Sequence, residues 1–471
     1  MKAKKIIRWT CLGLVGMFLI YCLIGIIPPA CHKKLNPDVL AQAGKVQYTS
    51  PSEGPERVHF VEDNYEAMVW RIRLINSARD HILLTTFTWQ EDAVGKELTA
   101  ALLQAAKRGV KIRLLIDGYY GWKFLTGNPY MDALIRNPNV QERFYNRYNY
   151  GHDWKLNYRL HDKILEVDNQ AYIVGGRNIQ NKFLGMEGRS SERIRDFDLV
   201  VRENRAPGSD SALPSLKSYF QELWRQPNHK DSFPSADKEA VQRAERELYR
   251  LYEELPGRYP EAYEAVDWQK VSVPTHKITL IWGDPVPHRK EPILGAKLYD
   301  LMSRGRVINI QTPYLMMNRT MYRAIADLNH GRTVNIVTNS AATCSNAFGA
   351  CDYMNQKKNI MKTGSTVFEN NGRATHAKAI TIDDRLTVVG SCNMDMRSEY
   401  LDSEIMLAVD SRELNAIVSR GIQGLKDTSL QVNPDGSTVP GKRYRKAEKT
   451  RERKWGYPFL RGVVWIIRPY L

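Results

Sequence analysis

The sequence predicts an α/β protein of two homologous halves, each an α-β-α sandwich, packed together with a shared site at their interface. An N-terminal transmembrane helix is expected to precede them. Three observations carry this prediction: a strand-helix-strand pattern that occurs twice, a His-x-Lys-x-x-x-x-Asp motif that occurs twice, and an uncharged run near the N-terminus. A chain of 471 residues, 43% of them apolar, can bury a core of that size.

Each half has one strand-helix-strand unit ahead of its motif, recognisable by its apolar periodicity. The strand, helix and strand are expected at residues 81–90, 95–109 and 110–118 in the first half, and at residues 306–315, 318–331 and 332–340 in the second. Gly109 and Gly331 close the two helices at matching positions. Because a crossover helix joins parallel strands, two related sheets are expected.

The repeated motif brings the same polar residues to both halves. Its members are His161, Lys163 and Asp168 in LHDKILEVD, and His376, Lys378 and Asp383 in THAKAITID. A Gly-x-x-Asn element follows each copy after the same interval, ending at Asn178 in GGRN and at Asn393 in GSCN. Since side chains alternate along a strand, each His and Lys pair shares one face and can point into a common site.

The uncharged run at residues 9–27 follows four basic residues and would span roughly 28 Å as a helix, enough to cross a bilayer. We therefore expect residues 1–31 to be a retained single-pass anchor in the cell membrane. The basic residues before it favour a cytoplasmic N-terminus, with the body of the protein outside the cytoplasm. A cleaved signal peptide would have a shorter apolar core. A lipid-modified Cys31 fits poorly, because two prolines stand before it.

The rest of the chain divides by composition. We expect a first half at residues 50–230, a charged helical linker or insertion at 231–269, a second half at 270–425 and a basic, amphipathic tail at 426–471. The last residues, WGYPFLRGVVWIIRPYL, are too short and too charged to span a membrane but suit its interface. A solvated basic tail is the alternative.

The net charge and the cysteines restrict the possible partners and the cellular compartment. The net charge of +16 favours a polyanionic neighbour, which can be nucleic acid, an anionic membrane surface or a phosphate-bearing substrate. Cys344 and Cys351 in TCSNAFGACD can close a small disulfide loop outside the cytoplasm, or remain free thiols.

The two motifs together supply what cleavage of a phosphodiester needs. One neutral imidazole can attack phosphorus and form a covalent phosphohistidine, while the other, protonated, donates to the departing alcohol and later deprotonates the incoming one. Lys163 and Lys378 would hold the phosphate charge, and the amides of Asn178 and Asn393 would donate to the same oxygens. This chemistry requires no metal and no other cofactor.

These residues resemble those of the phospholipase D superfamily. The resemblance rests on the paired motifs, on GGRN and GSCN, and on the downstream NMDMRSEYLDSEIML, and it extends from about Val58 to Gly424. It implies an acidic residue after each motif that hydrogen-bonds a catalytic His and fixes its tautomer. That residue is Glu404 in the second copy, and in the first it is Asp196 rather than Asp198 of RDFDLVV.

The same resemblance assigns roles to the motif residues. It implies His161 as the nucleophile and His376 as the acid and base, with the reverse assignment as the alternative. Asp168 and Asp383 are expected away from the reacting phosphate, where they would support the strand-turn structure.

Within the superfamily, the N-terminal apolar segment, GGRNIQNKFLG and RDFDLVV resemble bacterial cardiolipin synthases. This implies transfer of a phosphatidyl group from phosphatidylglycerol, through the active-site His, to a second phosphatidylglycerol. The alternatives are a phospholipase D that releases phosphatidic acid, a phosphodiesterase or nuclease of the superfamily, and an inactive binding protein. The expected partners are phospholipid and membrane rather than nucleic acid. The sequence leaves the acyl preference and the oligomeric state open.

Aromatic residues are dense before the first motif, at Phe144, Tyr145, Tyr148, Tyr150, Trp154 and Tyr158. They suit lipid headgroups, single-stranded nucleic acid or plain core packing, so this cluster alone does not discriminate.

Overall fold

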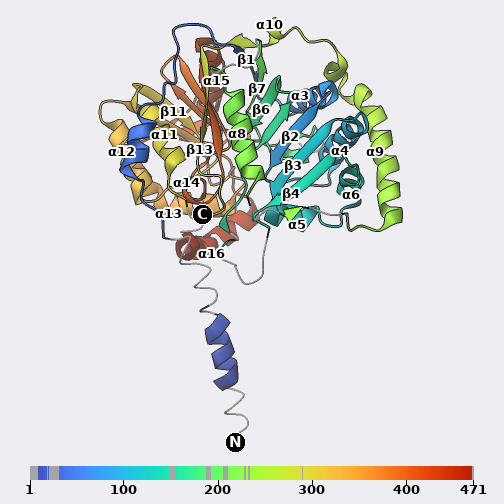
Figure 1. The fold of residues 1–471 in the computed structure, drawn as a ribbon. Coiled ribbons are helices and arrows are strands. Elements are labelled where there is room, and N and C mark those ends of the chain that lie inside the picture. Colours follow the sequence, from blue (N-terminus) through green and yellow to red (C-terminus); the bar gives the residue numbers. More distant parts are fainter. Residues whose placement is uncertain are drawn as a thin grey trace, which may run out of the picture.

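The structure is a computed structural model that describes residues 9–18, 20, 31–147, 155, 157–186, 193–204, 210–226, 230–231, 234–288 and 290–468. Within these residues the chain forms two large mixed sheets that lie side by side (Figure 1). The expected α/β class with two related halves is confirmed.

The first sheet belongs to the first half and gains one short edge strand from the beginning of the second. Its strands, in sheet order, are β8 (Lys230–Asp231), β4 (Val140–Tyr145), β3 (Lys111–Asp117), β2 (His81–Thr86), β5 (Ile164–Val167), β6 (Ala171–Gly175), β7 (Asp198–Glu203), β1 (Glu56–Val61) and β9 (Val273–Pro274).

The second sheet is built entirely from the later part of the chain. Its strands, in sheet order, are β10 (Lys277–Trp282), β18 (Ile405–Asp410), β16 (Leu386–Gly390), β15 (Lys378–Ile382), β11 (Val307–Gln311), β13 (Thr333–Asn339), β14 (Thr366–Asn370), β19 (Ser429–Val432) and β20 (Thr438–Pro440). A small separate ladder pairs β12 (Leu315–Met316) with β17 (Met394–Asp395).

The two sheets share one topology. The run β4-β3-β2-β5-β6-β7-β1 in the first corresponds, strand for strand, to β14-β13-β11-β15-β16-β18-β10 in the second. In both, the strand inside the motif pairs antiparallel with the first strand of the predicted strand-helix-strand unit, β5 with β2 and β15 with β11. The sequence repeat is therefore a repeat of the whole sheet.

The predicted strand-helix-strand units are confirmed. Helix α4 (Ala93–Lys107) connects the parallel strands β2 and β3, and α12 (Arg319–Asn329) connects the parallel strands β11 and β13. Each helix begins at a side-chain cap, Asp92 for α4 and Asn318 for α12. Gly109 and Gly331 follow them with φ of 99° and 76°, a left-handed conformation that suits glycine at a helix end.

Helices cover both faces of each sheet. On the outer faces, α3 (Asn64–Ser77) and α4 pack on the first sheet, while α11 (Ile293–Ser303) and α12 pack on the second. Between the sheets lie α8 (Leu213–Trp224) and α15 (Arg412–Asp427), whose apolar residues join those of both sheets in one central core (Figure 1). Each half is thus an α-β-α sandwich, and the halves share the middle core.

The remaining helices lie at the ends of the sheets or on the periphery. They are α2 (Pro37–Ala43), α5 (Gly118–Phe124), α6 (Pro129–Ile135), α7 (Asn181–Leu184), α9 (Lys238–Arg258), the 3-10 helix η2 (Pro260–Tyr263), α10 (Trp268–Val271), α13 (Ala347–Met361), α14 (Met396–Tyr400) and α16 (Arg451–Ile467). The predicted linker region contains α9, which packs along α4 and α6 at the outer edge of the first half (Figure 1).

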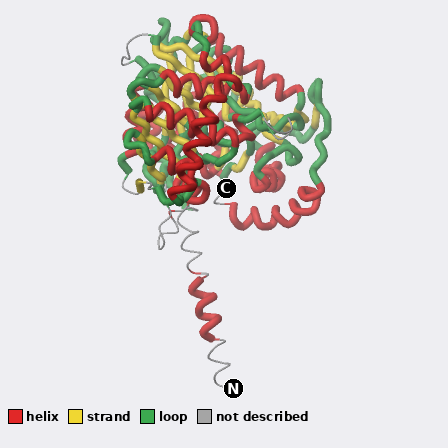
Figure 2. Tube along the Cα trace, turned by 90° about the vertical axis from the view of Figure 1, so that its right-hand side faces the viewer, coloured by secondary structure: helices red, strands yellow, loops and turns green. Residues whose placement is uncertain are grey.

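The predicted anchor falls largely outside the described residues, which at this end comprise 9–18 and 20. Residues 9–18 are helical and project from the body on the side where α16 lies (Figures 1 and 2). Across the part of the chain that the structure describes, no helix combines the length and apolar character needed to span a membrane.

Helix α16 of the C-terminal tail packs against α13 and the two cysteines. Cys344 and Cys351 are buried free thiols that pack with Tyr457 and Val464 of α16. Of the two alternatives left by the sequence, the structure therefore has the free thiols. The opposite face of α16 exposes Trp455, Phe459, Trp465 and Ile466, each more than 70% accessible.

The motif aspartates organise turns at the far ends of the strands from the histidines. Asp168 accepts hydrogen bonds from the backbone amides of Arg79, Asp80 and His81 at 2.7–2.9 Å, and Asp383 accepts from those of Arg306 and Val307 at 2.8–2.9 Å. Both residues have positive φ, 54° and 50°. This geometry favours the structural role expected for them.

Asp168→Ala removes the acceptor for three backbone amides and places an alanine at positive φ. We expect it to destabilise the protein by about 1.5–3 kcal/mol, the range for hydrogen bonds to a charged group, seen as a lower midpoint of urea unfolding. Asp384→Ala is the control, because that carboxylate is exposed and pairs with Arg412 on the surface. Equal midpoints for the two variants would contradict the structural role.

Candidate active site

Each motif histidine is held by a carboxylate from the opposite half. His161 Nδ1 lies 2.8 Å from Glu404 Oε1, and His376 Nδ1 lies 2.7 Å from Asp196 Oδ2. Glu404 directly precedes β18 of the second sheet, and Asp196 precedes β7 of the first. The two halves therefore complete each other's histidines.

Backbone hydrogen bonds also join the two halves beside each histidine–carboxylate pair. The His161 amide donates to the Ser403 carbonyl at 3.1 Å, and the Ser403 amide donates back to the Arg159 carbonyl at 2.9 Å. In the same way the His376 amide donates to the Arg195 carbonyl at 2.7 Å. These backbone hydrogen bonds place each histidine beside its partner carboxylate, whatever the orientation of the side chains.

The strands begin later than the sequence indicated. His161 and Lys163 lie in the extended segment ahead of β5, and His376 lies ahead of β15, which starts at Lys378. The physical reason is that the backbone around each histidine pairs with the opposite half instead of with its own sheet. The motif thus stands where its strand enters the interface.

Both lysines are buried beside their own histidines. Lys163 Nζ donates to the His161 carbonyl, and Lys378 Nζ donates to the His376 carbonyl at 2.7 Å. Lys378 Nζ also lies 2.9 and 3.0 Å from the two ring nitrogens of His376. An amine in this position is ready to contact any anion bound at the imidazole.

The electrostatics couple the two motifs. Burial lowers the pKa of Lys163 to about 7 and that of Lys378 to about 8. Burial also lowers the pKa of both histidines, and the charges of both lysines lower them further. Lys378 acts on His161 and Lys163 acts on His376, so each amine lies close enough to influence the ring of the other half.

The two carboxylates are ionised at neutral pH. Burial raises the pKa of Glu404 to about 6, and Lys163 together with hydrogen bonds from Ser391 and Ser398 limits that rise. For Asp196, burial is outweighed by His376 and Lys378, which hold its pKa below the usual range. Because an ionised carboxylate only accepts, each Nδ1 must carry the hydrogen, which leaves Nε2 of the neutral ring with its lone pair.

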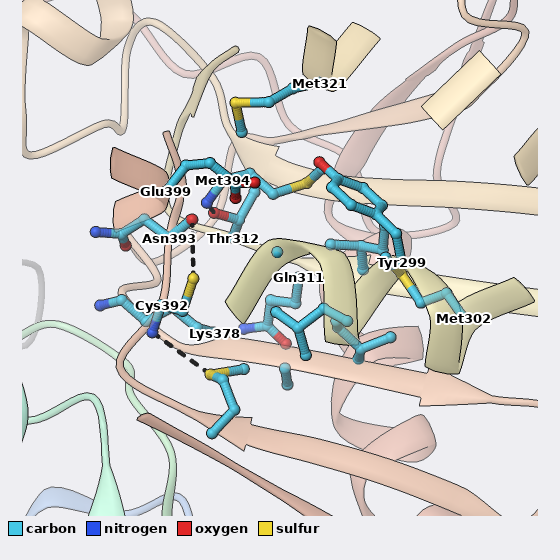
Figure 3. Close-up of a pocket in the computed structure, with 16 residues that line it drawn as sticks. Tyr299, Met302, Gln311, Thr312, Met321, Lys378, Cys392, Asn393, Met394 and Glu399 are labelled. Atoms are coloured by element: carbon cyan, nitrogen blue, oxygen red, sulfur yellow. Dashed lines mark hydrogen bonds between the residues drawn. The ribbon is translucent and has the colours of Figure 1, made fainter. Parts of the chain in front are cut away.

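The two motif asparagines are buried at the ends of the strands that follow each motif. Asn178 and Asn393 are each 6% exposed. Asn393 Nδ2 donates to the Tyr314 hydroxyl at 3.2 Å, and Asn393 lines a small cavity together with Lys378 (Figure 3). Within the described part of the chain, the Oδ1 atoms of both asparagines lack a hydrogen-bond partner.

Small side chains create room for the carboxylates. A Cβ on Gly176, the second glycine of GGRN, would collide with Asp196 Oδ1. In the second copy Ser391 takes this place, and its hydroxyl contributes a hydrogen bond that lowers the pKa of Glu404. The second residue of GGRN and of GSCN therefore lies beside the site carboxylate in both copies.

Three residues of the site were missed by sequence reasoning. The Ser398 hydroxyl donates to Glu404 Oε1 at 2.6 Å, and Phe87 and Phe183 pack against His161 and His376 with ring centroids 4.9 Å apart in each pair. Ser398 stands in the segment that carries Glu404, so its hydroxyl was a visible signal. The two phenylalanines have no common spacing from the motifs that would have revealed them.

The aromatic cluster before the first motif has a structural explanation where it is described. Phe144, Tyr145 and Tyr158 are buried, one in each of the three main cores, so they do not face headgroups. Tyr148, Tyr150 and Trp154 lie outside the described residues. No group of three or more potential metal ligands is assembled among the residues that the structure describes.

Lys378→Met removes one cation from the shared site and should raise the pKa of both His161 and His376. The pH dependence of the imidazole NMR signals measures this. Lys297→Met is the control, because that half-buried lysine lies on α11 and donates to the Trp282 carbonyl. A pKa rise confined to His376 would show that Lys378 does not act on His161.

Known proteins resemble this chain over most of its length. The family model described as "Cardiolipin synthase, PLD-like domain" matches residues 71–224 and 299–425, more than half of the chain. Cardiolipin synthase C of Escherichia coli (strain K12) is 26% identical over 420 residues, which span 80% of this chain and 86% of that protein. The major cardiolipin synthase ClsA of Bacillus subtilis (strain 168) is also 26% identical, over 70% of this chain and 61% of its own length.

A solved structure supports the same assignment at the level of the fold. The phosphatidylserine synthase of Haemophilus influenzae Rd KW20 superposes with a TM-score of 0.62 at 14% identity, covering 92% of this chain and 99% of that one. The duplicated sheet, the paired motifs and the match of the family model agree. This chain belongs to the phospholipase D superfamily, in the family of cardiolipin synthase, PLD-like domains.

Proposed function

We propose that this phospholipid-modifying enzyme is a phosphatidyltransferase that makes cardiolipin from two molecules of phosphatidylglycerol. The observation that carries the proposal is the pair of histidines, each oriented by a carboxylate of the other half and each flanked by a buried lysine. Two relatives named as cardiolipin synthases, similar along most of the chain, support this substrate.

In the first step, Nε2 of neutral His161 attacks the phosphorus of phosphatidylglycerol. A phosphorus–nitrogen bond forms and the phosphorus–oxygen bond to the headgroup glycerol breaks. His376, which takes up a proton when the anionic phosphate binds beside it, gives that proton to the glycerol oxygen. Lys163 and Lys378 neutralise the charge that builds on the non-bridging oxygens, and Asn178 and Asn393 donate to the same oxygens.

In the second step, a glycerol hydroxyl of another phosphatidylglycerol gives its proton to His376 and attacks the same phosphorus. The bond to His161 breaks, cardiolipin leaves, and both imidazoles return to their starting states. Glu404 and Asp196 stabilise the positive charge that each ring carries in turn, because both carboxylates accept from Nδ1.

We further propose that the protein is attached to a membrane through its N-terminal segment, with α16 lying in the interface. The described part of that segment exposes Trp9, Leu12, Leu14 and Val15. The exposed aromatics of α16 are accompanied by basic residues, a composition typical of helices that lie on anionic bilayers.

Purified protein mixed with phosphatidylglycerol in detergent should produce cardiolipin and glycerol in equal amounts, as measured by lipid chromatography and a glycerol assay. The proposed chemistry uses only side chains of this chain, so a chelator should leave the rate unchanged. Phosphatidic acid without cardiolipin would instead identify a hydrolase.

His161→Ala and His376→Ala should each lower cardiolipin formation by at least about 10³-fold, because residues that act as a unit cannot replace one another. His330→Ala is the control, since His330 is exposed beyond α12. Substantial activity in either active-site variant, with circular dichroism like that of the wild type, would contradict the shared mechanism.

The buried lysines predict a loss of kcat/KM at alkaline pH. The pKa of Lys163 is lowered to about 7 and that of Lys378 to about 8 by burial, so both lose their protons as the pH rises through 7 to 8. Because the cationic forms bind phosphate, kcat/KM should fall across this range, while kcat changes less once bound phosphate holds the protons on. A fall that begins only near pH 10, where ordinary lysines titrate, would contradict the role of burial.

A further inference from the structure

A large cavity lies on the outer side of the second half, between α11 and α12. Its volume is about 780 Å³, within the range of about 300–1,000 Å³ typical of ligand pockets. Its apolar lining includes Leu35, Leu40, Pro292, Ala296, Met321 and Leu328. We refer to it as the α11–α12 cavity.

The segment that follows the proposed anchor forms one wall of this cavity. His32 stacks on Tyr400 with ring centroids 4.0 Å apart, and Arg304 donates to the carbonyls of Gly44 and Val46 at 3.1 and 2.7 Å. Lys33 and Lys34 lie on the same segment and line the cavity. The cavity is therefore walled by the part of the body nearest to the proposed anchor and carries cations there.

The α11–α12 cavity adjoins the active site. A smaller cavity of about 40 Å³ is lined by Lys378 and Asn393 (Figure 3). Tyr299, Met321 and Glu399 line both cavities, so these three side chains form the partition between them. Burial raises the pKa of Glu399 to about 8, which leaves a neutral carboxyl able to donate to an ester or hydroxyl oxygen.

The position of the cavity distinguishes between the two lipids of the reaction. Lys378 contacts the ring of His376, which in the proposed mechanism protonates the leaving alcohol and deprotonates the entering one. The entering lipid must therefore approach from the side of His376. The lining combines apolar walls with three cations, Lys33, Lys34 and Arg332, against two carboxylates, Asp300 and Asp327. It therefore matches a phospholipid, whose acyl chains are apolar and whose phosphate is anionic.

We propose that the α11–α12 cavity binds an acyl chain of the acceptor phosphatidylglycerol, with its glycerol headgroup directed towards Lys378 and Asn393. This inference rests on the proposed transferase function. It assigns the second lipid a binding site separate from that of the donor.

The test uses the full-length protein and dioleoyl phosphatidylglycerol in detergent micelles, with label in the headgroup glycerol. Ala324→Trp fills the cavity from α12 and should lower steady-state cardiolipin formation about tenfold or more. The first-turnover burst of glycerol should keep its amplitude, because the donor step does not use the cavity. Ala326→Trp, at an equally half-buried alanine of α12 that does not line the cavity, is the matched control and should behave as wild type.

A second pair of variants avoids any effect on the fold. Leu40 is 51% exposed on α2 and lines the cavity, so Leu40→Asp should also lower cardiolipin formation while keeping the burst. Gln42→Asp, exposed on the same helix outside the cavity, should leave both unchanged. With dihexanoyl phosphatidylglycerol, whose short chains fill little of the cavity, the defects of Ala324→Trp and Leu40→Asp should shrink to about twofold or less.

Two results would overturn the inference while leaving the proposed function intact. One is wild-type cardiolipin formation from dioleoyl phosphatidylglycerol in both Ala324→Trp and Leu40→Asp. The other is an equal loss of burst and steady state in Leu40→Asp, which would assign the cavity to the donor. By contrast, a wild-type protein that releases glycerol but forms no cardiolipin would overturn the proposed function itself.

Discussion

The structure depends on the crossed pairing of histidines and carboxylates between the two halves. His161 is oriented by Glu404 and His376 by Asp196, and both pairs are backed by main-chain hydrogen bonds across the interface. The motif histidine of each half therefore depends on the other half for its carboxylate. The central core shared by α8, α15 and both sheets holds the halves in the register that this pairing needs.

Burial gives these groups their chemical character. An amine or imidazole surrounded by protein favours its neutral form, and the nearby carboxylates compensate only in part. A phosphate diester bound here would add negative charge beside the two lysines and so favour their protonated forms. Binding of the substrate and protonation of the lysines support each other, which concentrates positive charge where the reaction develops negative charge.

Much of this arrangement could be predicted from the sequence, because duplication makes local patterns reliable. The strand-helix-strand units, with Gly109 and Gly331 after their helices, agree with the observed strands β2 and β3 and β11 and β13. Glu404 and Asp196 were identified as partners of histidines, but which histidine each one serves depends on how the halves pack. That packing is set by contacts between residues that lie hundreds of positions apart in the sequence, and no local sequence pattern encodes them.

The dependence on tertiary packing also explains what else the sequence left undecided. The sequence left headgroup contact, nucleic-acid stacking and core packing open for Phe144, Tyr145 and Tyr158. Each fills a different core, because burial depends on the whole sheet and not on composition nearby. The α11–α12 cavity combines residues near position 35 with others near 300 and 325, so its existence follows only from the tertiary structure.

The attachment of residues 32–46 to the body has a mechanical consequence. His32 lies flat on Tyr400, Asn318 donates to His32, and Arg304 grips the carbonyls of Gly44 and Val46. A membrane anchor that continues into this segment would be attached to a segment that is itself held by stacking and hydrogen bonds. The proposed anchor would then join the body at a defined point of the second half, next to α11 and α12, instead of through a long free linker.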